Sequence, residues 1–210
     1  MARELVVGRP ETLRGEIHEM CQQTVEMLRL TWEGFRKQDP RPLEPAHTLG
    51  REIHRREKAL TELVVRVPAA PGVAGPGPEL RFVPMHLERI GDNIEFLVRA
   101  TQTMVREGVP FTERAMREIN ALFEKAIELM ECVRDAVLTR NRVLVAHVLA
   151  EGQRYERIAD EYALAHQQRL IEGVCMARAS SVYLALLDYL KGIEWHTRQI
   201  AQRLSAAPPS

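Results

Sequence analysis

Apolar residues recur at helical spacing along most of the chain. The clearest row has steps of three or four residues, the spacing of one buried helix stripe: Leu80, Val83, Leu87, Ile90, Ile94, Leu97, Thr101 and Met104. Similar rows occur in four other segments: Leu13, Ile17, Met20, Thr24, Met27 and Thr31; Leu49, Ile53, Leu60, Leu63 and Val64; Met116, Ile119, Phe123, Ile127 and Met130; and Leu186, Leu190, Ile193, Thr197, Ile200 and Leu204. The pattern predicts an all-α protein.

Proline and glycine divide this pattern into six predicted helices. Three prolines lie within residues 38–45, and residues 68–78 are rich in Pro, Gly and Ala, so neither segment favours a regular element. Gly108 and Pro110 end a third helix, and Thr112 is placed to cap a fourth. The helices are expected over residues 10–37, 45–67, 79–107, 112–139, 143–171 and 176–204.

The third and sixth helices have matching apolar registers. Val83, Leu87, Ile90, Ile94 and Leu97 align in order with Leu186, Leu190, Ile193, Thr197 and Ile200. This match predicts two tandem three-helix units, residues 1–110 and 111–210, which pack as one elongated helical bundle.

Composition narrows the possible functions. The 210 residues carry no net charge, so there is no basic excess of the kind that nucleic-acid binding needs. Three cysteines far apart in the sequence are typical of reduced thiols in a cytoplasmic protein. The N-terminal residues do not resemble a signal peptide, and no apolar run approaches the length of a membrane span. Nucleotide-binding and nucleophile motifs are also absent from the sequence, which favours a protein that is not an enzyme.

The third predicted helix carries two acids beside its apolar stripe. Glu88 and Asp92 are one turn apart, so both carboxylates extend from the same edge of the helix. Like charges at this spacing repel unless a cation lies close to them. Arg89, a basic residue of a neighbouring helix, or a metal ion could provide the positive charge.

The segment LERIGDN, residues 87–93, resembles the signature of the PhoU family, and so does the arrangement of two three-helix repeats. The resemblance implies a regulator without catalytic activity that restrains phosphate uptake and phosphate-responsive signalling. It implies two partners, the ATPase of a phosphate ABC transporter and a sensor histidine kinase, which would hold the cytoplasmic protein at the inner membrane. Homodimerisation is left open.

The resemblance also implies metal sites, because some members bind iron or zinc through paired carboxylates. Glu88 and Asp92 match the pair of the first repeat, and Glu57 matches a carboxylate of the second helix, with Thr61 in place of its partner. Fe, Zn or another divalent metal is therefore expected mainly in the first repeat. In the fifth helix, Glu156 and Asp160 form a second, weaker pair.

The second repeat departs from this pattern. Lys191, Trp195 and Arg198 stand where the first repeat has Glu88, Asp92 and Glu95. Lys191, Arg198 and Arg178 could form an anion-binding face, or they could pair with acids of the protein. Two other readings of the whole chain remain: a di-iron-type carboxylate metal protein, and a helical scaffold or dimerisation module that binds no metal.

Overall fold

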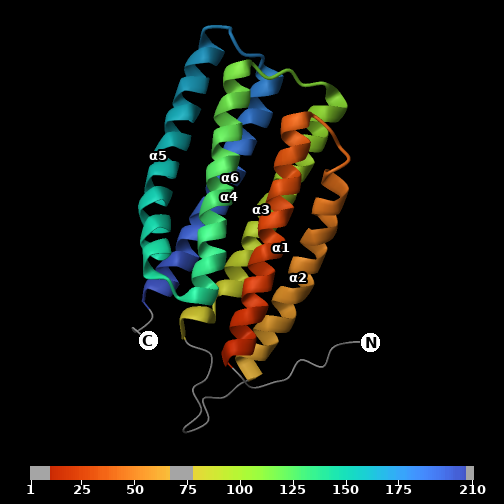
Figure 1. Cartoon of the computed structure of the whole chain (residues 1–210). Coiled ribbons are helices and arrows are strands. Elements are labelled where there is room, and N and C mark those ends of the chain that lie inside the picture. Colours follow the sequence, from red (N-terminus) through yellow and green to blue (C-terminus); the bar gives the residue numbers. More distant parts are fainter. Residues whose placement is uncertain (1–9, 67–77, 207–210) are drawn as a thin grey trace.

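A computed structural model of the chain describes residues 10–66 and 78–206 (Figure 1). These residues form six α-helices and one short 3-10 helix, with no β-strand in the described ranges. The α-helices are α1 (Pro10–Lys37), α2 (Leu43–Arg66), α3 (Val83–Glu107), α4 (Glu113–Thr139), α5 (Arg142–Ile171) and α6 (Ala177–Ser205), and the 3-10 helix is η1 (Pro78–Leu80). The all-α prediction is confirmed.

Local capping explains where several of these helices begin and end. The Thr112 side chain accepts a hydrogen bond from the Ala115 backbone N–H at 3.2 Å, as predicted for the start of α4. Asn141 caps α5 in the same way through the Val143 N–H at 2.9 Å. Gly108 ends α3 with a left-handed backbone, φ 58°, a conformation that glycine adopts without a steric penalty.

The third helix starts later than its sequence predicted. Residues from 79 onward were expected to be helical, but η1 occupies Pro78–Leu80 and α3 begins at Val83. Pro84 explains the difference, because proline has no N–H and fits only the first turn of an α-helix.

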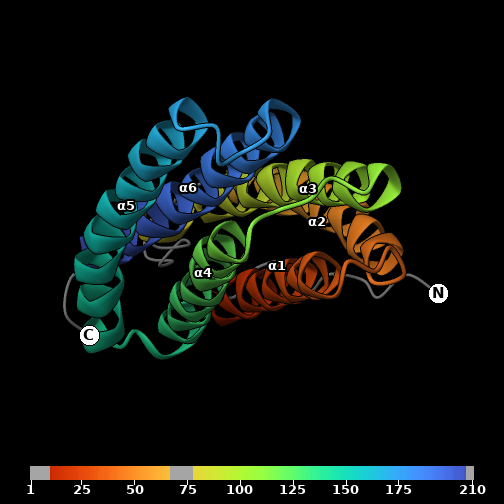
Figure 2. The ribbon, with the colours of Figure 1, turned by 90° about the horizontal axis from the view of Figure 1, so that it is seen from above.

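Two pairs of helices form the centre of the molecule, and one helix flanks each side. Helix α1 packs against α3 and α4, and α6 packs against the same two helices. Helix α2 lies on α1 and α3, while α5 lies on α4 and α6 (Figures 1 and 2). The helices of the two repeats therefore meet along the α1–α4 and α3–α6 contacts.

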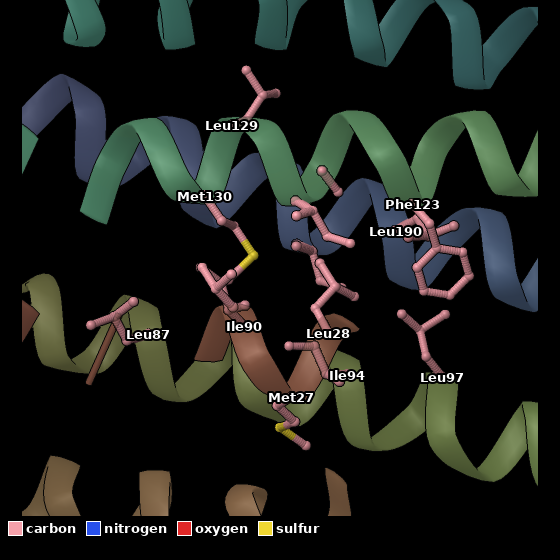
Figure 3. Close-up of a cluster of buried hydrophobic side chains, with 14 of the residues drawn as sticks. Met27, Leu28, Leu87, Ile90, Ile94, Leu97, Phe123, Leu129, Met130 and Leu190 are labelled. Atoms are coloured by element: carbon pink, nitrogen blue, oxygen red, sulfur yellow. The ribbon is translucent and has the colours of Figure 1, made fainter. Parts of the chain in front are cut away.

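One continuous core runs through both repeats. Figure 3 shows part of it, with Met27 and Leu28 of α1 near Ile90 and Ile94 of α3. Leu190 of α6 and Phe123 of α4 belong to the same buried cluster. The apolar row predicted for the third helix is buried at all eight positions. Leu63 and Val64, which belong to the row predicted for the second helix, have side chains that lie outside the described part of the structure.

The predicted boundary between residues 110 and 111 falls in the connection between α3 and α4. The division into two three-helix units stays a prediction, and the shared core argues for cooperative folding of the whole chain. Within the described ranges, no helix combines the length and the apolar character that a bilayer crossing requires.

Candidate functional site

Arg89 supplies the positive charge beside the two acids of α3. Its Nη1 donates to Asp92 Oδ2 at 3.2 Å, and its Nε lies 3.8 Å from Glu88 Oε2. Glu88 also receives a contact from α2, with His54 Nδ1 at 3.2 Å from Oε1. The repulsion that the sequence indicated is thus relieved by an arginine of the same helix and a histidine of the neighbouring helix.

Glu57, the third predicted ligand of the first repeat, interacts within its own helix. Its Oε1 accepts a hydrogen bond from the Thr61 hydroxyl at 2.7 Å. In the part of the chain that the structure describes, no group of three or more His, Cys, Asp or Glu side chains is arranged to hold a metal ion. This donor set does not fit a multinuclear cluster as it stands, and the metal assignment stays a prediction.

The acid pair of α5 contacts the basic residues of α6. Lys191 Nζ donates to Asp160 at 2.6 Å, and Arg198 Nη2 donates to Glu156 at 2.8 Å. Arg178 pairs with Glu107 of α3. The three cations considered for an anion-binding face are therefore all ion-paired, two with α5 and one with the first repeat.

The outer helices α2 and α5 thus contribute different kinds of ionisable side chain to their contacts with the inner helices. In the first repeat α3 provides the acids, and α2 faces them with His54 and with His47, whose Nδ1 is 3.7 Å from Glu95 Oε1. In the second repeat α5 provides the acids and α6 provides Lys191 and Arg198. The first-repeat contacts between α2 and α3 thus pair acids with imidazoles, whereas those between α5 and α6 pair acids with Lys and Arg.

Glu194 is a buried acid that the sequence reasoning missed. Its side chain is only 2% exposed, and burial raises its pKa to about 7 although Arg198 acts in the opposite direction. Gly152 of α5 makes room for it, because a Cβ at that position would collide with Glu194 Oε1. The glycine within α5 was the signal that could have indicated a close approach.

Two histidines join the repeats along the α3–α6 contact. His86 Nδ1 and His196 Nδ1 are 3.1 Å apart, and the rings of Trp195 and His196 are perpendicular, with centroids 4.7 Å apart. Burial and the nearby Arg203 lower the pKa of His86, and burial, His86 and Arg89 lower the pKa of His196 to about 4. Both rings are therefore neutral at pH 7, and one donates its N–H to the other.

A buried polar network ties α4, α5 and α6 together at the far end of the second repeat. Arg169 donates to both carboxylate oxygens of Glu118, at 3.1 and 2.7 Å, and the Tyr183 hydroxyl donates to Glu118 at 2.6 Å. Burial acts to raise the pKa of Glu118, but these hydrogen bonds and one from Arg114 outweigh it and leave the pKa below its usual value. Sequence spacing could not reveal this network, since its members lie on three helices.

Comparison with known proteins identifies the fold. No family model and no curated protein matches the chain. Among solved structures, PhoU from Pseudomonas aeruginosa matches with a TM-score of 0.79 and 17% identity, over 92% of this chain and 94% of that one. The phosphate transport system regulatory protein PhoU from Streptococcus pneumoniae matches with a TM-score of 0.80 and 12% identity, over 93% and 92%. The chain therefore has the PhoU fold.

Proposed function

We propose that this protein is a PhoU-like regulator that modulates phosphate uptake and phosphate-responsive signalling by binding other proteins. The observation that carries the proposal is the likeness of the whole fold to two PhoU structures, over more than nine-tenths of each chain. The partners implied by the sequence resemblance are the ATPase of a phosphate transporter and a sensor histidine kinase. Binding, not catalysis, is the activity proposed.

The outer face of the α3–α6 contact is the surface proposed to bind the partner. Phe82, Phe96 and Trp195 are 43–49% exposed there, and Phe96 stacks on Tyr189 with ring centroids 5.1 Å apart. The chain has only eleven Phe, Trp and Tyr residues, so four on one face is a concentration. Arg203 lies over Phe82 at 5.0 Å, and aromatic and arginine side chains are enriched in protein interfaces.

The test is capture of partners by the tagged full chain from cells grown in high and in low phosphate. The transporter ATPase or the sensor kinase should be recovered, and the Trp195→Ala and Phe96→Ala variants should reduce its recovery at least about tenfold if these are interface anchors. Val143→Ala is the matched control, since Val143 is 77% exposed at the start of α5. Recovery of neither partner in either condition would reject the proposal.

A metal-binding role in the first repeat is the second proposal. Its support is the meeting of a carboxylate and an imidazole, Glu88 and His54, beside Asp92. Both groups are ordinary metal ligands, although Arg89 contacts both carboxylates. Elemental analysis of protein purified without chelator tests it: a stoichiometric metal that disappears in Asp92→Asn supports the site, and a metal-free protein rejects it.

A further inference from the structure

A pocket lies where the α3–α4 and α5–α6 connections meet. Both connections run across the upper end of the bundle in Figure 1. Its volume is about 190 Å³. The wall is mostly apolar and comes from both connections and from the adjoining turns of α4, α5 and α6; it includes Phe111, Ala115, His166, Val174, Met176 and Ala179.

His166 is the unusual member of this wall. Its side chain is 2% exposed, and neither ring nitrogen has a hydrogen-bond partner within the described residues. The ring stacks on Tyr183, with centroids 4.3 Å apart and an interplanar angle of 23°. A buried polar group without a partner costs free energy, so two such atoms beside a pocket indicate a missing partner.

The chemistry around His166 disfavours a charged ligand. Burial and Arg169 lower the pKa of His166, so the imidazole is neutral and offers one donor and one acceptor. Arg169 is held by both oxygens of Glu118, and Tyr183 also donates to Glu118. Neither group is left to neutralise an anion, and a phosphate ion would lose its hydration against apolar walls.

We propose that this pocket binds a small, neutral aromatic molecule with one hydroxyl or ring N–H group, which hydrogen-bonds to His166. The size agrees, because an apolar cavity of about 150 Å³ is large enough to hold benzene. Val174 and Met176 are 59% and 60% exposed, so the apolar wall continues to the surface and provides an entrance. The phenol and indole classes combine these properties.

The test is calorimetric titration of the full chain with phenol, indole and benzene. Phenol should bind saturably, and His166→Phe should reduce the ratio of phenol affinity to benzene affinity about tenfold, the worth of one hydrogen bond. Ala179→Leu, which fills the pocket, should abolish binding of all three. His147→Phe, a substitution at an exposed histidine of α5, is the matched control and should leave the affinities for all three compounds unchanged.

The Val174→Trp variant tests the same pocket without a substitution at a buried residue, so the test still holds if the buried variants do not fold. Val174 is exposed at the entrance, so a larger side chain there should block the pocket without disturbing the core. Absence of saturable phenol binding to the wild type, or unchanged binding in Val174→Trp and Ala179→Leu, would overturn the proposal. Competition by inorganic phosphate would also overturn it. These readouts are independent of partner capture, so the proposed regulatory function can fail or stand separately.

Discussion

His86 and His196 place two imidazole nitrogens 3.1 Å apart across the contact between the two repeats. They lie 110 positions apart in the sequence and come from α3 and α6. Burial disfavours a positive charge on both rings, and Arg203 near His86 and Arg89 near His196 add to this effect. The contact between the repeats therefore contains a pair of imidazoles whose neutral form is favoured.

Acid is expected to weaken this contact. An unfolded histidine has a pKa near 6.5, whereas the folded pKa of His196 is about 4, so the unfolded state binds more protons between these values. The stability contributed by the neutral pair is present above about pH 6.5 and is lost as the pH falls toward 4. Urea unfolding at a series of pH values should show this loss.

Substitution of His196 by Gln isolates that effect from other titrating groups. His196→Gln should flatten the fall in stability between about pH 6.5 and 4. His147→Gln is the control, because His147 is partly exposed and pairs with Glu128 on the surface. Glu194 acts in the opposite direction, since its raised pKa favours the folded state as the pH falls below about 7. Identical pH profiles for wild type and His196→Gln would contradict the prediction.

Gly152→Ala is expected to destabilise the protein by about 1–3 kcal/mol, the usual cost of overpacking. The added methyl would collide with Glu194, whose buried side chain has little freedom to move. Thermal unfolding measures the effect. Gly15→Ala is the matched control: nothing lies within 4 Å of its Cβ position in α1, so alanine should stabilise by about 0.5–1 kcal/mol. Equal effects of the two substitutions would show that α5 and α6 do not depend on this close approach.

Arg169→Met is expected to cost about 3–5 kcal/mol, because it leaves the buried Glu118 without its main cationic partner. Removing both charges with Glu118→Gln and Arg169→Met should cost less than the sum of the single effects. Arg29→Met provides the exposed comparison; its ion pair with Glu131 is worth about 1 kcal/mol or less. Chemical denaturation of the four variants measures these differences, and additive effects would argue against a coupled network.

Asp92→Asn is expected to change the free energy of unfolding by less than about 1 kcal/mol, since the Asp92–Arg89 pair is largely exposed. The variant should therefore fold normally, and any effect on metal content or partner capture can be assigned to the carboxylate itself. Unfolding experiments at low and high salt measure the contribution of the pair. A loss of several kcal/mol would mean that Asp92 has a structural role beyond the pair with Arg89.

The sequence by itself determined the helices and their buried faces. Helix period, proline and glycine positions and capping residues act over a few positions, so the bounds of α1 and the burial of the row from Leu80 to Met104 could be predicted. The placement of Glu88 and Asp92 on one helix edge could be predicted for the same reason. The start of α3 at Val83 follows from a local rule as well, because Pro84 fits only the first turn of an α-helix.

Only the tertiary structure decided which side chains meet between helices. Lys191 reaches Asp160, Arg198 reaches Glu156, and His86 reaches His196 because the rotation and separation of packed helices select the partners. The pocket beside His166 arises in the same way, where two connections far apart in the sequence meet. Helical periodicity predicts the face on which a residue lies, but long-range packing decides what that residue contacts.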